Sequence, residues 1–115
     1  VLSKHWPQRA AFLEALKSRL RAMPPRKAYY PGAEQRYDSF LKAHPEAQAF
    51  GAKTPGVVPW TLIADVNPDN KDDICFKSEA FCGVLAECVT TQVPNAVKNT
   101  DDPEEYGYRD ANDAE

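Results

Sequence analysis

The sequence contains no long hydrophobic run. None of its apolar stretches approaches the roughly 18 residues needed to cross a bilayer. Its first residues, VLSKHWPQR, lack the apolar core of a secretion signal. We therefore expect no membrane partner and a cytoplasmic location. With 115 residues, the chain is long enough for one hydrophobic core and one domain.

Cysteine is also scarce, and its spacing excludes two kinds of site. The chain has Cys75, Cys82 and Cys88, with no CxxC pair. This pattern argues against a disulfide framework and against a zinc site. We thus expect no metal ligands, and we predict reduced cysteines that act as small apolar residues in or beside a strand. A reactive thiolate would need a nearby histidine or helix N-terminus, and His5 and His44 lie far from the cysteines along the sequence.

A continuous run of basic residues is missing as well. Residues 1–53 hold ten Lys/Arg and four Asp/Glu, whereas residues 54–115 hold four and thirteen. Basic residues spaced singly along helical patterns are not typical of nucleic-acid binding. We therefore expect no nucleic-acid partner, and two oppositely charged halves that attract each other.

The final 25 residues form an acidic tail with few large aliphatic side chains. Such a composition is compatible with disorder. The tail can also dock on the basic first helix through Tyr106 and Tyr108, and we favour docking because two aromatic residues are present.

Apolar spacing predicts an amphipathic helix over residues 7–22, with Pro7 as its first residue and the pair Pro24 and Pro25 ending it. The predicted apolar stripe comprises Phe12, Leu16, Leu20 and Met23.

A second amphipathic helix is predicted from Ala33 to the residue before Pro45. Its apolar stripe comprises Tyr37, Phe40, Leu41 and His44. We interpret His44 as a partly buried residue at the helix end rather than as a ligand.

Two strands are predicted in the second half, on either side of the polar turn NPDNKDD. WTLIADV alternates, with Trp60, Leu62, Ala64 and Val66 on one side. The stretch FCGVLAECV, residues 81–89, is almost continuously apolar, which favours an interior strand covered on both faces. The predicted fold class is α/β, with two amphipathic helices packed on a small mixed sheet.

Four segments occur in an order that resembles the aldehyde dehydrogenase superfamily, specifically an outlying branch of it. They are HWPQRAAFLEAL, AYYPGAEQRYDSFLKAHPEAQAFG, PWTLIADV and SEAFCGVLAE. The resemblance covers residues 1–87 and corresponds to the catalytic domain just after the nucleophilic cysteine. It implies that residues 1–90 form a partial catalytic domain, and it leaves residues 91–115 without a recognised counterpart.

In that family, a Glu-x-Phe-Gly-Pro stretch supplies a glutamate that hydrogen-bonds the nicotinamide ribose and a phenylalanine near the nicotinamide. Glu79 and Phe81 match these positions, so the resemblance implies that they face NAD(P). Cys82 and Gly83 replace the Gly and Pro, which puts the local turn in question. Read from the residues alone, Glu79 is a solvated residue at the start of a strand.

The resemblance places the family's nucleophilic cysteine before Val1 and its general base and dinucleotide-binding half further upstream. The sequence contains no GxGxxG motif. We expect no catalytic residue and no bound cofactor in the isolated chain, which would be a truncated and inactive aldehyde dehydrogenase-like protein. Apolar surfaces that the absent elements would cover predict a homodimer or higher oligomer.

A second hypothesis is a stand-alone oligomeric binding or interaction module with an unknown ligand. Trp60, Tyr29 and Tyr30 would line its pocket, although aromatic residues at such spacings more often belong to a core.

Overall fold

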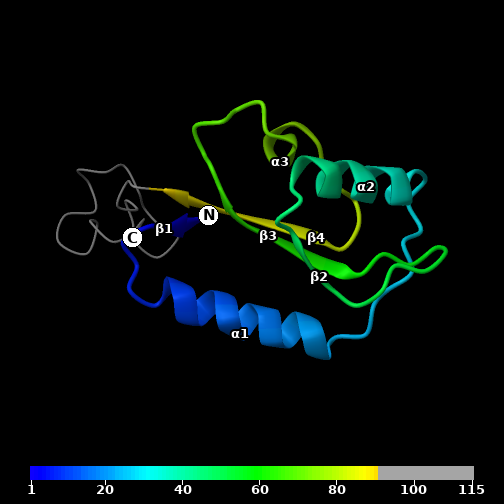
Figure 1. Ribbon diagram of the computed structural model, residues 1–115, viewed down its shortest axis with the longest axis horizontal. Helices are drawn as coiled ribbons and strands as arrows, with labels where there is room; N and C mark the ends of the chain where they lie inside the picture. Colours follow the sequence, from blue (N-terminus) through cyan, green and yellow to red (C-terminus); the bar gives the residue numbers. More distant parts are fainter. Residues whose placement is uncertain (91–115) are drawn as a thin grey trace, which may run out of the picture.

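The computed structural model describes residues 1–90 (Figure 1). The elements, in chain order, are β1 (Leu2–Ser3), α1 (Arg9–Ala22), α2 (Ala33–Ala43), β2 (Gln48–Phe50), β3 (Trp60–Val66), α3 (Ile74–Lys77) and β4 (Val84–Thr90). The predictions about the acidic tail, including docking through Tyr106 and Tyr108, fall outside the described residues. Within residues 1–90, every helix is too short or too polar to cross a lipid bilayer.

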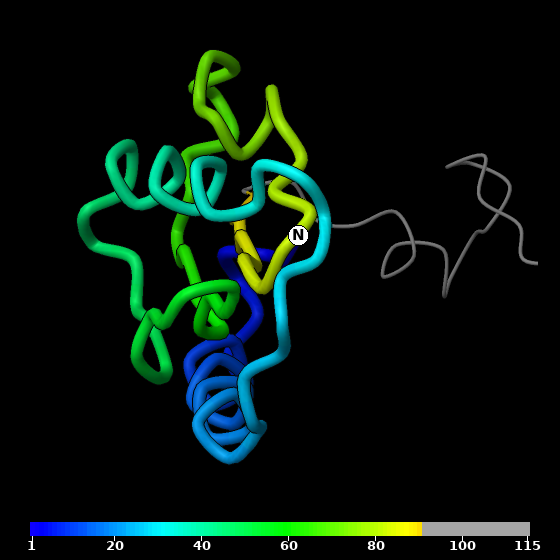
Figure 2. Tube along the Cα trace, turned by 90° about the vertical axis from the view of Figure 1, so that its right-hand side faces the viewer, coloured from blue at the N-terminus to red at the C-terminus, as the bar shows by residue number. Residues whose placement is uncertain are grey.

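The sheet is mixed and lies between two layers of helix. Its strand order is β1-β4-β3-β2, with β4 parallel to both β1 and β3, and β2 antiparallel to β3. Helix α1 covers one face, and α2 and α3 cover the other (Figure 1). The connection between α1 and α2 carries the chain along one side of the molecule, from the first helical layer to the second (Figure 2). The α/β class, the two main helices and the mixed sheet are thus confirmed.

Helix α1 ends where the sequence predicts but starts two residues later, at Arg9 rather than Pro7. Its last residue, Ala22, precedes Pro24, which cannot continue a helix. The side chains that α1 buries are Leu13 and Leu20. Leu13 and Leu20 are seven residues apart, so they lie on the same side of the helix. This side faces the sheet.

The predicted stripe of α1 is wrong at both ends. Phe12 and Met23 are exposed. Phe12 packs on Trp6 instead, with 5.7 Å between the ring centroids. Leu13, which the prediction missed, is buried instead of Phe12.

Helix α2 begins at Ala33, as predicted, and its inward stripe is confirmed. Gly32 precedes it with φ of +75°, a left-handed conformation that glycine adopts without a steric penalty. Tyr37 and Phe40 are buried against the sheet, and the Tyr37 hydroxyl lies 3.0 Å from Oγ1 of Thr61. The stripe ends at His44, which is buried at the C-terminus of the helix.

Strand β3 does not show the predicted alternation. Three successive residues, Thr61, Leu62 and Ile63, are buried, because helices cover both faces of this strand. The register then shifts by one residue, since Ile63 pairs with Ala86 and Val66 pairs with Cys88. Asp65 has φ of +60° within this bulge. Ile63 and Val66 therefore share the core cluster with Phe40, on the α2 side.

The prediction of a strand at 81–89 covered on both faces is corrected. Strand β4 is interior in the strand order, but it starts at Val84 and leaves Leu85 45% exposed, with Ala86 exposed as well. Because successive strand residues point to opposite faces, neither face of β4 is fully covered within residues 1–90. The two-sided burial belongs to β3 instead.

Candidate functional site

The loop between α3 and β4 carries both residues that the resemblance selected. Glu79 is exposed, and its carboxylate makes no hydrogen bond or ion pair with other residues in the described range 1–90. Glu79 and Phe81 both line one cavity of about 350 Å³. Phe40, Val84 and Ala86 give this cavity an apolar floor. The Glu79 carboxylate, a hydrogen-bond acceptor, thus lies beside the exposed Phe81 ring at the edge of an apolar cavity.

Arg36, on α2, holds this loop in place. Its Nε donates a hydrogen bond to the carbonyl oxygen of Ala80 at 2.8 Å, and its Nη1 donates one to the carbonyl oxygen of Pro31 at 2.6 Å. The guanidinium also lies 5.6 Å from the centroid of the Phe81 ring, within reach of a cation–π interaction. The remaining nitrogen, Nη2, is buried without a hydrogen-bond partner among the described residues.

The turn after Glu79 has an unusual backbone. Phe81 has φ of +48° and its side chain is 53% exposed. A positive φ is uncommon for a non-glycine residue and costly for a bulky one. Position 83 is glycine here, where the family has proline. A side chain fits poorly at this position, because an added Cβ would lie 3.0 Å from Cε3 of Trp60.

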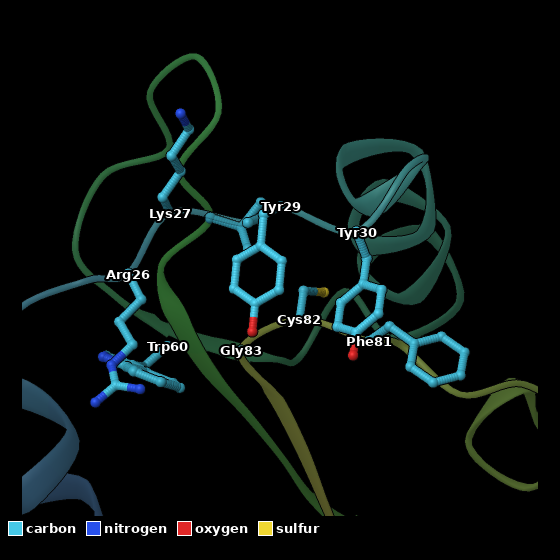
Figure 3. A pocket seen from close by; sticks show the side chains of 10 residues that line it. Arg26, Lys27, Tyr29, Tyr30, Trp60, Phe81, Cys82 and Gly83 are labelled. Atoms are coloured by element: carbon cyan, nitrogen blue, oxygen red, sulfur yellow. The ribbon is translucent and has the colours of Figure 1, made fainter.

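Phe81 also borders a second, aromatic pocket of about 250 Å³ (Figure 3). Tyr30 stacks between the two other aromatic neighbours, with centroid distances of 5.2 Å to Tyr29 and 5.5 Å to Phe81. Trp60 lies on the opposite wall and donates a hydrogen bond from Nε1 to the carbonyl oxygen of Pro24. Tyr29 is 79% exposed, so it lines a pocket and does not belong to the core.

Arg26 and Lys27 complete this aromatic pocket. Both come from the connection that joins the two helical layers. The Arg26 guanidinium lies beside Trp60, whereas the Lys27 side chain extends away from the aromatic rings (Figure 3). The pocket therefore combines flat aromatic walls with one cation. Such a lining suits a planar ligand that carries negative charge.

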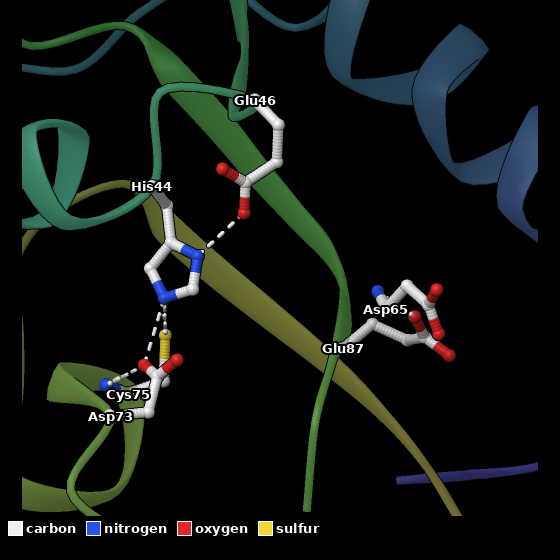
Figure 4. A network of polar contacts seen from close by, with 6 residues as sticks. All are labelled: His44, Glu46, Asp65, Asp73, Cys75 and Glu87. Carbon is white, nitrogen blue, oxygen red and sulfur yellow. Dashed lines mark hydrogen bonds and ion pairs between the residues drawn. The ribbon is translucent and has the colours of Figure 1, made fainter. Parts of the chain in front are cut away.

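A polar cluster that the sequence did not predict surrounds His44 (Figure 4). Its Nδ1 lies 2.6 Å from Oε1 of Glu46, and its Nε2 lies 2.8 Å from Oδ1 of Asp73. The same Nε2 is 3.7 Å from Sγ of Cys75. His44 is thus next to a cysteine that is 31 residues away in sequence, and distance along the chain was a misleading guide. Cys75 itself lies in α3 and packs against the core cluster that includes Ile63 and Val66 of β3.

The electrostatics of this cluster favour a charged imidazole and a neutral thiol. Burial of His44 opposes its protonation, but the hydrogen bonds to Asp73 and Glu46 outweigh burial and raise its pKa above 6.5. Burial, together with the neighbouring Asp73 carboxylate, raises the pKa of Cys75 to about 12. In the absence of a metal ion, Cys75 is therefore a poor nucleophile at neutral pH.

A third polar group is structural. Glu87 of β4 is only 6% exposed and accepts two hydrogen bonds of 3.0 Å from Nε and Nη2 of Arg9. It also accepts one of 2.7 Å from the backbone N–H of Asp65 at the bulge. Burial alone would raise the pKa of Glu87, but these donors outweigh it and hold the pKa below the usual 4.5.

We predict an acid-sensitive contribution from Glu87. Because its folded pKa is lowered, the unfolded chain takes up the proton first as the pH falls. The stabilisation is therefore fully present above about pH 4.5 and is lost as the pH drops through the lower folded value. Urea unfolding measured from neutral pH to about pH 3 should show this loss, and Glu87→Gln should flatten the curve. An unchanged slope in Glu87→Gln would contradict the assignment.

Comparison of the chain with protein-family models, with curated proteins and with solved structures gave no match.

Proposed function

We propose that residues 78–83 form part of a NAD(P) site in an aldehyde dehydrogenase-like catalytic domain. Glu79 would accept hydrogen bonds from the nicotinamide ribose, and Phe81 would lie beside the nicotinamide ring. One observation carries the proposal: a carboxylate without a partner in residues 1–90 opens into the same cavity as an exposed aromatic ring. The resemblance of SEAFCGVLAE to the family's motif supplies the identity of the ligand.

The chemistry of the loop suits a ribose. A vicinal diol offers two O–H donors, and one ionised carboxylate can accept both in charge-assisted bonds. Arg36 fixes the carbonyl of Ala80, between the two ligand-facing residues. A loop that is already ordered loses less conformational entropy when a ligand binds.

The same resemblance implies binding without turnover. Oxidation of an aldehyde by this family needs a cysteine nucleophile, an oxyanion site and a base that activates water. The resemblance assigns none of the three to residues 1–115. Because the 115-residue chain would contact only one part of the cofactor, we expect it to bind NAD too weakly to retain it, with a Kd on the order of 1 mM, and to form no NADH from aldehydes.

Fluorescence of Trp60 tests this proposal. Trp60 lines the pocket that Phe81 shares, and Trp6→Phe removes the other tryptophan. We expect NAD to change the Trp60 emission saturably, and Glu79→Ala to weaken binding at least about tenfold, equivalent to about 1.4 kcal/mol. Glu14→Ala, an exposed glutamate on α1, is the matched control and should bind as well as the parent. Equal affinity in Glu79→Ala and in the parent would refute the assignment.

The aromatic pocket favours a second candidate function, a stand-alone binding module. Its cation, the Arg26 guanidinium beside Trp60, and its flat walls suit a planar anion (Figure 3). The titration above separates the two functions. Loss of NAD binding in Tyr29→Ala with no effect of Glu79→Ala would place the ligand in the aromatic pocket and not in the Glu79 cavity.

We also propose that the chain forms a homo-oligomer. The supporting observation is Leu85, an apolar side chain that is 45% exposed although β4 is an interior strand of the sheet within residues 1–90. Exposed apolar strand surface is commonly covered by association. A second copy would bury it.

A further inference from the structure

Three side chains with metal-binding atoms meet where α2 ends and α3 begins (Figure 4). His44 comes from the C-terminus of α2, and Asp73 and Cys75 come from the start of α3. Their ligand atoms all lie within 4.8 Å of one another. Nitrogen, oxygen and sulfur are therefore brought to one point by two segments that are about thirty residues apart.

The distances are close to those of a tetrahedral zinc site. With Zn–N of about 2.0–2.1 Å and Zn–S of about 2.3 Å, a tetrahedral angle separates the nitrogen and sulfur by about 3.5–3.6 Å. Nε2 of His44 and Sγ of Cys75 are 3.7 Å apart. The corresponding separation of nitrogen and oxygen is about 3.3 Å, against 2.8 Å between His44 and Asp73. An ion therefore fits after Asp73 moves outward by about half an ångström.

Glu46 supplies an independent observation that points to a metal. Histidines that bind metals almost always donate their other ring N–H to a carboxylate, a carbonyl or water. The second ring nitrogen of His44, Nδ1, lies 2.6 Å from Oε1 of Glu46. When an incoming ion displaces the Nε2 proton, this contact keeps the remaining proton on Nδ1 and holds Nε2 towards Asp73 and Cys75.

We propose that His44, Asp73 and Cys75 bind a zinc ion through Nε2, a carboxylate oxygen and Sγ. Glu46 acts as a positioning residue, and water takes the fourth position. When the ion binds, Cys75 loses its Sγ proton and a protonated His44 loses its Nε2 proton, so up to two protons pass to solvent. The ion then lies between Nε2, Sγ and the carboxylate oxygen, where its positive charge takes the place of the lost protons.

The ligand set favours zinc over other common ions. Magnesium and calcium prefer oxygen ligands alone, whereas one imidazole, one thiolate and one carboxylate suit a borderline-soft ion with tetrahedral geometry. A metal ion also removes the obstacle that burial imposes on the thiol, because a coordinating thiol is deprotonated outright. Cys75 also lines the cavity of about 350 Å³ that Glu79 borders.

Cobalt(II) and zinc titrations of the reduced, full-length chain test the proposal. Cobalt is a spectroscopic substitute for zinc, and a thiolate bound to it absorbs in the near ultraviolet. We expect one equivalent of cobalt to produce this band, and zinc to displace the cobalt and abolish the band. Cys75→Ser should remove the band, and Cys88→Ser, a cysteine outside the cluster, should retain it.

Glu46→Gln distinguishes a metal site from a simple hydrogen-bonded cluster. Its side chain is largely exposed, so the variant should fold normally, yet zinc affinity should fall by roughly 10–100-fold. Zinc should also raise the Tm of the parent chain and leave that of Cys75→Ser unchanged. A parent chain without the band, or a band that survives in Cys75→Ser, would overturn the proposal.

Discussion

Replacing Glu87 with leucine is expected to lower the free energy of unfolding by about 3–5 kcal/mol, the usual cost of breaking a buried ion pair by removing one partner. Leucine has nearly the volume of glutamate but no acceptor. The change therefore leaves the Arg9 guanidinium and the N–H of Asp65 without the oxygen atoms that they contact at 2.7–3.0 Å. Urea unfolding followed by fluorescence measures the loss.

Two matched variants separate the loss of the Glu87 charge from the general effect of removing a glutamate. Glu87→Gln retains an amide oxygen for the N–H of Asp65 but removes the charge that faces Arg9, so it should cost less than Glu87→Leu. Glu14→Leu removes an exposed glutamate that pairs with Lys17, and its effect should stay within about 0.5 kcal/mol. A Glu87→Leu variant as stable as Glu14→Leu would show that Glu87 does not tie α1 to the bulge in β3.

Ile63→Ala is the second large effect and is expected to cost about 2–5 kcal/mol. Ile63 is 0% exposed and forms the core cluster with Phe40 and Val66. Truncation there leaves a cavity between α2 and the sheet, because the surrounding side chains relax only partly. The milder variant Ile63→Val should cost about 0.5–1.5 kcal/mol.

Leu85→Ala is the control for this prediction, because Leu85 lies on the neighbouring strand and is 45% exposed. Half of a leucine side chain left in water predicts a cost of about 1 kcal/mol. A cost equal to that of Ile63→Ala would contradict the exposed position of Leu85 in the single chain. If this larger cost appeared only at high protein concentration, it would support a second copy that covers β4.

Local patterns in the sequence predict the two long helices, α1 and α2, but not the short helix α3. Pro24 cannot continue a helix, and α1 ends at Ala22. The spacing of Tyr37 and Phe40 places both on the buried face of α2. These signals depend only on residues within one or two helical turns, so the sequence contains all that is needed to read them.

The errors come from contacts between distant segments. The bulge at Asp65 is stabilised by Glu87, from another strand, and no period-two pattern within residues 60–66 can show it. The residues of β4 are mostly apolar, but the burial of each one depends on which helices cover the strand. The short helix α3 follows the predicted polar turn at residues 67–73, in a segment for which the sequence predicted no element.

The candidate sites were predictable to different degrees. Glu79 and Phe81 were chosen from a resemblance, and the structure places both on one cavity without testing the ligand. The sequence names Tyr29 and Tyr30 as pocket residues under one hypothesis, but the spacing of the aromatic residues favours a place in the core. The cluster around His44 was missed, since 31 residues separate His44 from Cys75 in sequence and only packing of α3 against α2 joins them.

A nuclear magnetic resonance titration tests the central claim, that residues 78–83 receive the nicotinamide riboside half of NAD(P). Nicotinamide mononucleotide is added to the isotope-labelled chain, and adenosine monophosphate is added to a second sample. The account predicts saturable shifts of the backbone amides of residues 78–83 with the first compound, and an attenuated response in Glu79→Ala. Shifts of equal size with both compounds, or shifts that spare residues 78–83, would contradict it.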